Sequence, residues 1–170
     1  GAVPPPTPAQ ARAWVLAGLQ RMARDGFTAV HEAGADAELM TAFEALEASG
    51  DLPVRVYAML SARDTALSRA WLTKGPRLDP AAMLTVRSVK AYYDGSLGSR
   101  GARLIDDYAD QKGHRGVSGG NYGFDQALVA EMMTAGFQVG IHAIGDAGNR
   151  ETLDFIQSVE ARDAAGRDNR

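Results

Sequence analysis

The feature that most constrains the fold of this chain is a regular alternation of helical and strand-like patterns. Amphipathic segments that begin at capping residues alternate with short apolar runs typical of buried strands. This alternation predicts a parallel sheet whose strands are joined by right-handed helical crossovers. We expect helices at 7–26, 36–50, 64–74, 125–135 and 148–162, and strands at 27–30, 53–60, 84–93 and 137–142.

A parallel sheet of this kind either closes as a (β/α)8 barrel or stays open as a doubly wound sheet, and both have the same sequence period. A barrel typically needs eight strands and about 250 residues. The chain has 170 residues and only four expected strands, so it is either a small open sheet or a piece of a larger fold. Because it contains neither an internal repeat nor a linker, we expect residues 1–170 to form a single segment without a second domain.

The composition excludes several classes of protein. The chain is 45% hydrophobic and carries a formal charge of -3 with scattered Lys and Arg, so we expect a globular core and no nucleic-acid partner. No apolar stretch approaches the roughly 20 residues that cross a bilayer, so we expect no membrane partner. The chain has no cysteine, which fits a cytoplasmic protein and leaves histidine, carboxylates or an unusual lysine as metal ligands.

Polar side chains follow one face of the last two expected strands. Alternate residues of a strand point to opposite sides, so one face of the third strand carries Ser88, Lys90, Tyr92 and Asp94. By the same rule, one face of the fourth strand carries Gln138, Gly140 and His142, while its other face is apolar and should pack against helices. Parallel strands are normally apolar on both faces. We therefore expect the polar rows to face a functional site.

Lys90 and His142 are the candidate metal ligands. A lysine on an inward strand face loses solvation, which lowers its pKa and favours the neutral amine. A neutral amine can form a Schiff base, or it can take up carbon dioxide and become a carbamate that ligates metal ions. The alternatives are a lysine that extends to solvent and a histidine that is hydrogen-bonded in the core. His31 follows the first expected strand, and we interpret it as a structural or supporting residue rather than a ligand.

The long segment 94–123 after the third strand contains eight glycines and no helical or strand period. Its start is glycine-rich, but it lacks the Gly-Lys-Ser/Thr of a phosphate-binding loop and the spacing of a dinucleotide fingerprint. A long loop in a compact domain often has a function. We interpret it as a substrate-contacting loop in which Arg100 is available for an anion, the alternative being a solvated arginine.

Two motifs together resemble a known family. They are Val-Lys90-Ala-Tyr-Tyr-Asp-Gly-Ser-Leu-Gly-Ser-Arg100 and Gln138-Val-Gly-Ile-His142-Ala-Ile-Gly-Asp146, with a weaker match at 27–34. They resemble the amidohydrolase superfamily, and within it the amidohydrolase 3 metal-dependent hydrolases. The resemblance implies a (β/α)8 barrel that holds zinc or another divalent metal at the carboxyl ends of its strands and uses metal-activated water to hydrolyse an amide-type C–N bond of a small molecule.

The resemblance also implies roles for single residues. Lys90 matches the carboxylated lysine of strand four that bridges the metals, and His142 matches the ligand on strand five. The substrate side of the pocket would be formed by Asp94, Gly95, Ser96, Arg100 and Asp146.

Other parts of the family's site have no counterpart in this sequence. The His-x-His of strand one, the histidine of strand six and the aspartate of strand eight are absent. We therefore expect strands two to five of an incomplete barrel, inactive by itself and self-associating as a homo-oligomer through exposed sheet edges. The alternative from another class is a self-standing α/β module that binds a small molecule or a partner without catalysis.

Overall fold

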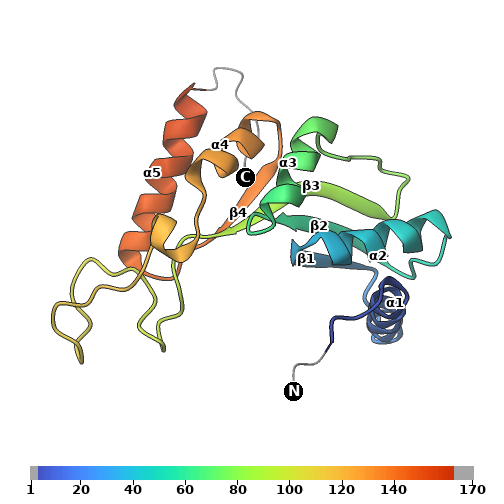
Figure 1. Ribbon diagram of the computed structural model, residues 1–170, viewed down its shortest axis with the longest axis horizontal. Helices are drawn as coiled ribbons and strands as arrows, with labels where there is room; N and C mark the ends of the chain where they lie inside the picture. Colours follow the sequence, from blue (N-terminus) through green and yellow to red (C-terminus); the bar gives the residue numbers. More distant parts are fainter. Residues whose placement is uncertain (1–3, 163–170) are drawn as a thin grey trace.

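The computed structural model describes residues 4–162, which form helices and strands in strict alternation (Figure 1). The predicted element order is confirmed. Within the described residues the elements are α1 (Pro8–Arg24), β1 (Ala29–Ala35), α2 (Ala37–Ala48), β2 (Arg55–Ser61), α3 (Thr65–Lys74), β3 (Leu84–Tyr92), the short 3-10 helix η1 (Gly119–Tyr122), α4 (Gln126–Thr134), β4 (Gln138–His142) and α5 (Asp146–Arg162).

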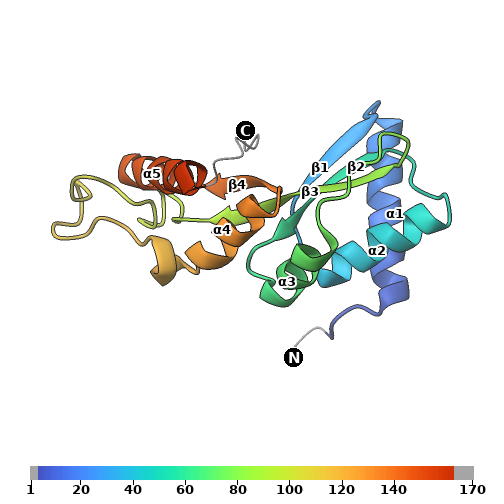
Figure 2. The ribbon, with the colours of Figure 1, turned by 90° about the horizontal axis from the view of Figure 1, so that it is seen from above.

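The strands form one four-stranded sheet in the order β1-β2-β3-β4, and all three pairings are parallel. Each helical crossover therefore connects a strand to its immediate neighbour. A doubly wound sheet reverses its strand order at a switch point, and the described residues contain no such reversal. Helices α2, α3 and α4 pack on the sheet, with α3 against β2 and α4 against β3 and β4 (Figure 2).

Capping side chains explain where the helices begin. The Thr7 hydroxyl accepts the backbone N–H of Gln10, and Pro8 occupies the first helical position. Asp36, Asp64 and Asp125 each accept the backbone N–H three residues further on. A capping side chain satisfies an N–H that the first helical turn leaves unpaired. These residues therefore fix the starts of α1, α2, α3 and α4.

Two predicted boundaries were wrong. β1 runs over Ala29–Ala35 instead of 27–30, because its pairing with β2, and not its own apolar content, determines its length. His31 consequently lies inside β1 and not after it. The last helix begins at Asp146 rather than Gly148, because the N–H of Asn149 donates to the carbonyl oxygen of Gly145 at 2.8 Å and closes the first helical turn there.

The hydrophobic core lies between the sheet and the helices. Its largest fully buried side chains are Phe137, Met40, Leu46, Leu60, Leu84, Leu128, Met132 and Met133. The register between β2 and β3 shifts at Arg87, which is an extra residue in β3. Because of this bulge, Val86 and Val89 both face the helices and are completely buried. Ser88 and Lys90 face the opposite, polar side of the sheet.

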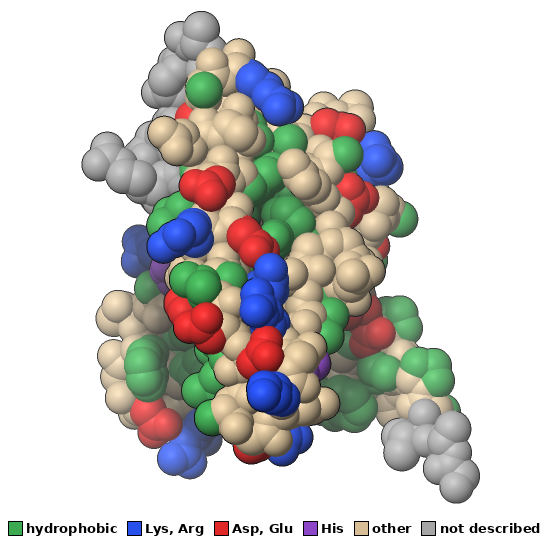
Figure 3. All heavy atoms as spheres, turned by 90° about the vertical axis from the view of Figure 1, so that its left-hand side faces the viewer, with side chains coloured by type: hydrophobic (Ala, Val, Ile, Leu, Met, Phe, Trp, Pro, Cys, Tyr) green, Lys and Arg blue, Asp and Glu red, His purple; other side chains and the backbone are tan. Residues whose placement is uncertain are grey.

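The segment between β3 and α4 extends away from the sheet beside α5 (Figure 1). It is tied together by ion pairs that join Arg100 to Asp110 and Arg115 to Asp107. Figure 3 shows this end of the molecule, where basic and acidic side chains are interspersed. No patch of a single sign dominates the face that is visible there.

Candidate functional site

The structure places Lys90 and His142 on the same face of neighbouring strands. In the parallel pairing of β3 with β4, Lys90 lies opposite Gly140 and Tyr92 lies opposite His142. Registered partners in a sheet point to the same side, so the two polar rows expected from the sequence are adjacent. Both side chains lie near the carboxyl ends of their strands, where parallel α/β sheets place their sites.

Tyr92 lies between the two candidate ligands. The Lys90 ammonium is 4.8 Å from the centre of the Tyr92 ring, and the His142 ring centre is 5.4 Å from that of Tyr92. Burial lowers the pKa of Lys90 below its ordinary value. A Cβ at Gly140 would approach Met59 Cε to 2.6 Å, whereas it would lie in ordinary contact with Lys90 Cδ at 3.9 Å. The site therefore favours a neutral amine at Lys90 more than open solvent does.

Asp94 connects the ends of β3 and β4. Its carboxylate is completely buried and accepts three backbone N–H groups, from Arg103 at 2.8 Å and from Ile144 and Gly145 at 2.9 Å each. One carboxylate oxygen, Oδ1, also lies 4.0 Å from Nε2 of His142. A buried carboxylate with several N–H donors is a strong structural contact. Asp94 thus fixes the turn that directly follows His142.

Two glycines allow this turn to pack closely on the loop. A Cβ at Gly145 would lie 1.8 Å from the carbonyl oxygen of Arg103, and a Cβ at Gly148 would lie 2.6 Å from Oδ2 of Asp94. Neither approach is sterically possible for another residue without movement of the backbone. The glycines of the motif after His142 are therefore required for packing against Asp94 and Arg103.

The other predicted substrate residues have partners within the loop. The N–H of Gly95 donates to the carbonyl of Gly101 at 3.0 Å, and the Ser96 hydroxyl lies 2.8 Å from that of Ser99. The Arg100 guanidinium forms a two-pronged pair with Asp110. Within residues 4–162 no hydrogen bond or ion pair joins Ser96 or Arg100 to Lys90 or His142.

Asp146 also faces the loop. Its Oδ1 accepts the backbone N–H of Ile105 at 2.9 Å as well as that of Ala147. These N–H groups, above all that of Ile105, lower the pKa of Asp146. Asp94 and Asp146 thus anchor the same loop to the end of β4. Whether Asp94, Gly95, Ser96, Arg100 and Asp146 contact a substrate stays a prediction.

A hydrogen-bonded group that sequence reasoning did not find lies further along the polar face. The Tyr57 hydroxyl is 2.6 Å from that of Ser88 and donates to Oε1 of Gln138 at 2.5 Å. The His31 ring stacks on Tyr57 with centres 4.7 Å apart. These side chains line a shallow depression of about 280 Å³. The strand alternation indicated this face, but the partners depend on the register of three strands.

A second residue that sequence reasoning missed is Arg63, which follows β2 by two positions. Its guanidinium carbon lies 4.5 Å from the centre of the Tyr92 ring and 5.3 Å from that of Tyr122. The only sequence signal for it was its place directly after a strand. It therefore lies at the same end of the sheet as Lys90 and His142.

The described residues supply part of a metal centre. Within residues 4–162 there is no group of three or more His, Cys, Asp or Glu side chains that could hold a metal ion. Lys90 and His142 together offer one nitrogen donor from each of two strands. A catalytic zinc site normally has three protein ligands, so these two residues fit a portion of such a site and do not complete it.

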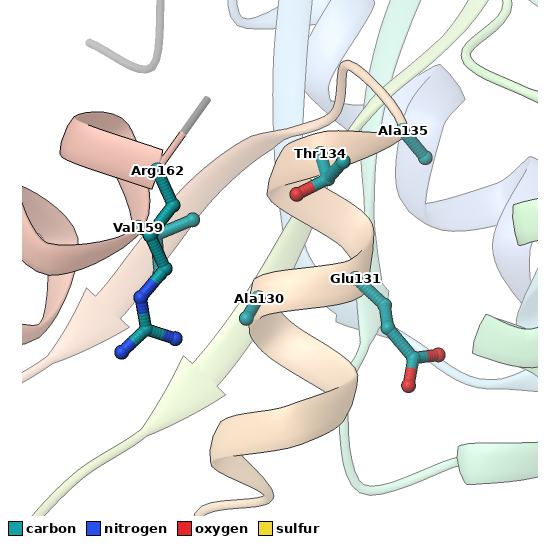
Figure 4. A pocket seen from close by; sticks show the side chains of 6 residues that line it. All are labelled: Ala130, Glu131, Thr134, Ala135, Val159 and Arg162. Carbon is teal, nitrogen blue, oxygen red and sulfur yellow. The ribbon is translucent and has the colours of Figure 1, made fainter. Parts of the chain in front are cut away.

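A further pocket lies apart from the candidate ligands. It has a volume of about 500 Å³ and lies between α4 and α5 (Figure 4), where its lining residues are Ala130, Glu131, Thr134, Ala135, Val159 and Arg162. None of the candidate site residues lines it. The candidate site at the carboxyl end of the sheet is thus separate from this cleft.

The fold and the site together define an α/β protein whose polar side chains gather at the carboxyl ends of adjacent parallel strands. Residues 1–170 match the sequence model of the Amidohydrolase family over their whole length. The chain therefore belongs to the amidohydrolase family, and the family predicted from its two motifs is confirmed. Within the part that the structure describes, no helix is long and apolar enough to cross a bilayer.

The chain is also similar to individual proteins. Over 85 residues the chain is 40% identical to the protein LONG AFTER FAR-RED 3 of Arabidopsis thaliana. The aligned segment makes up 46% of this chain and 13% of that protein. Two uncharacterized metal-dependent hydrolases, from Pyrococcus horikoshii OT3 and Pyrococcus furiosus, share its fold with a TM-score of 0.79 each, at 23% and 24% identity. The two matches include 90% and 91% of this chain, but only 31% and 32% of the chains of the two structures.

Proposed function

We propose that this chain is the segment of strands two to five of a (β/α)8 barrel in a metal-dependent amidohydrolase that hydrolyses a C–N bond. The observation that carries the proposal is the placement of Lys90 and His142 on one face of neighbouring strands at their carboxyl ends. The chain belongs to the amidohydrolase family, and its strand order is not reversed. It also matches 31% and 32% of two proteins that are described as metal-dependent hydrolases. These three facts support the proposal.

In this proposal Lys90 and His142 hold the divalent metal together with ligands from other strands. Such a metal supplies a water molecule of lowered pKa and polarises the bond to be cleaved. The neutral Lys90 amine reacts with carbon dioxide by forming an N–C bond and releasing a proton, which gives an anionic oxygen donor. The desolvation that lowers the pKa of Lys90 favours this reaction, because only the neutral amine is nucleophilic.

The remaining residues position these groups. Asp94 holds the turn after His142 through Ile144 and Gly145, so the imidazole is fixed relative to β3. We propose that the loop from Gly95 to Arg100 and the Asp146 turn form the substrate side of the pocket. The small-molecule substrate is of the amide type. By itself, the chain holds too few ligands for turnover.

The decisive experiment replaces Lys90 in a protein that carries the complete barrel. We expect Lys90→Ala to lower kcat/KM by at least about a thousandfold, which corresponds to about 4 kcal/mol of transition-state stabilisation. Bound metal should fall in parallel, while the circular dichroism spectrum stays unchanged. Lys112→Ala, in the exposed part of the loop, is the matched control. Full turnover in the Lys90→Ala protein would remove Lys90 from the mechanism.

A second candidate function is a self-standing module that binds a small molecule or a partner without catalysis. It is favoured by the depression that His31, Tyr57 and Gln138 line on the polar face. Metal analysis of the purified protein separates the two functions. Stoichiometric zinc with a carboxylated Lys90 supports the hydrolase, whereas a compact, ordered monomer without metal supports the binding module.

A further inference from the structure

The arginine at the carboxyl end of β2 is held in place although it is exposed. The Arg63 guanidinium lies over the face of Tyr92 at 4.5 Å and near the ring of Tyr122 at 5.3 Å. Its Nη2 also donates to the carbonyl oxygen of Tyr122 at 3.5 Å. Contacts with two aromatic rings restrict the rotamers of a long side chain. Arg63 is therefore oriented before any ligand arrives.

The backbone that carries Arg63 is anchored on both sides. The N–H of Ala62 donates to the carbonyl oxygen of Lys90 at 2.9 Å, which ties this loop to the end of β3. Asp64 accepts the N–H groups of Leu67 and Ala37 at 3.0 Å each, one on each carboxylate oxygen. The loop after β2 is thus bound to β3 and to the starts of α2 and α3. Arg63 consequently keeps a fixed position relative to Lys90.

The positive charge of the Arg63 guanidinium is not paired with a carboxylate of the described residues. Arg69 and Arg100 pair with Glu131 and Asp110, but Arg63 has no carboxylate partner among residues 4–162. The carboxylate that follows Arg63 in the chain, Asp64, accepts the backbone N–H groups of Ala37 and Leu67. Among residues 4–162, the charge of the Arg63 guanidinium is therefore available to an anion.

We infer that Arg63 binds a carboxylate group of the substrate, so that the substrates are amide-type compounds that bear a carboxylate near the bond to be cleaved. This inference rests on the function proposed above and names its substrate class. The guanidinium carbon of Arg63 lies over the Tyr92 ring, whereas hydrogen bonds to a carboxylate are made by the N–H groups at the edge of the guanidinium. Contact with the ring and two-pronged carboxylate binding are therefore compatible. Arg100 already uses its edge on Asp110.

The test is a titration of the full chain with acetate, with acetamide as the neutral analogue of the same shape. The side-chain Nε–H signal of Arg63 and the ring signals of Tyr92 are followed by NMR at constant ionic strength. We expect saturable shifts with acetate and none with acetamide. Equal shifts with both probes, or no saturation with acetate, would overturn the inference.

Two variants make the test specific. Arg63→Gln should weaken acetate binding about tenfold. The glutamine amide is still polar, but it has neither the positive charge nor the two parallel N–H donors of the guanidinium. Arg55→Gln is the matched control at the opposite end of β2, where the side chain is also exposed, and it should bind acetate as the unchanged chain does. Unaltered acetate binding by Arg63→Gln, or an equal loss in both variants, would sink the inference.

The outcome does not depend on the test of the proposed function. Acetate binding requires neither metal nor turnover. If Lys90→Ala keeps full activity in the complete barrel, the hydrolase mechanism fails while an acetate site at Arg63 can still be measured. If acetate does not bind at Arg63, the substrate class fails while the role of Lys90 is untouched.

Discussion

At the scale of single residues, Asp94 shows how one buried carboxylate can fix the backbone around a candidate site. It accepts hydrogen bonds from the backbone N–H of Arg103 in the loop and from those of Ile144 and Gly145 in the turn. An unpaired carboxylate at this depth would be strongly destabilising, and the three donors remove that cost. The same contacts fix the backbone that follows His142. Stability and the geometry of a proposed ligand therefore depend on the same side chain.

We predict that Asp94→Asn destabilises the chain by about 3 kcal/mol. Asparagine has one acceptor oxygen, so at least one of the three N–H groups would face an NH2 group instead. Urea denaturation measures the change in the free energy of unfolding. Amide exchange should accelerate most at Ile144 and Gly145.

The control for this prediction is Asp154→Asn, an exposed position on α5, which should change stability by less than about 0.5 kcal/mol. Equal unfolding midpoints for the two variants would show that the hydrogen bonds of Asp94 do not stabilise the fold more than an exposed carboxylate does.

The sequence predicted the positions of Lys90 and His142 because strand alternation is a local property. It did not predict the partners of Asp94 or Arg100. Ile144 is 50 residues from Asp94 along the chain, and Arg100 meets Asp110 only because the loop folds back. Arg63 was missed for a related reason, since its neighbours Tyr92 and Tyr122 come from other elements. The local sequence pattern determines which face of a strand a residue occupies, whereas the tertiary fold determines which residues it contacts.

At the scale of elements, the loop between β3 and α4 is held by carboxylates whose pKa values are lowered. The Arg115 guanidinium lowers the pKa of Asp107, Arg100 lowers that of Asp110, and the N–H of Ile105 lowers that of Asp146. All three residues tie the loop to itself or to α5. Loop order and carboxylate ionisation are therefore coupled.

We predict that this loop loosens in acid before the sheet does. A carboxylate whose pKa is lowered in the folded state stabilises that state above its ordinary value of 3.8, and the contribution is lost as the pH falls through the lower folded value. Hydrogen exchange, corrected for its intrinsic pH dependence, should lose protection below pH 3.8 at Ile105 and Gly113, whose N–H groups bond to Asp146 and Asp107. Val89 in β3 should keep its protection.

Unchanged protection at Ile105 and Gly113 across this range would contradict the prediction. The two exposed ion pairs of the loop should also weaken as salt is added.

The elements themselves could largely be predicted, because capping residues mark helix starts within the local sequence. Asp36, Asp64 and Asp125 are examples that the structure confirms. The edge strand β1 could not be placed in this way. Its sequence from Ala29 to Ala35 is short of large apolar residues, and its length follows from pairing with β2. Edge strands with weak patterns depend on their partner for definition.

At the scale of the whole molecule, the sheet is asymmetric. One face is covered by helices, whereas the other carries the polar group of Tyr57, Ser88 and Gln138 and the candidate ligands. The strand order leaves one edge free on β1 and one on β4, and within residues 4–162 no further strand pairs with them. In the barrel that we propose, these edges meet further strands. The alternation of elements predicted the parallel sheet, but it could not distinguish an open sheet from part of a barrel.

We predict that the isolated chain self-associates through these edges. Unpaired N–H and C=O groups on an edge strand are ready to pair with another chain. Sedimentation should detect dimers or larger species whose share rises with protein concentration. Ala33→Lys places a charge on the exposed surface of β1 and should weaken association about tenfold, because a lysine on an edge opposes pairing.

Ala48→Lys, on the exposed end of α2, introduces the same charge away from both edges and should leave association unchanged. A compact monomer at high concentration, or an equal effect of both variants, would argue against edge pairing. Such a monomer would instead support the self-standing binding module, since a sheet that is stable with open edges does not need further strands.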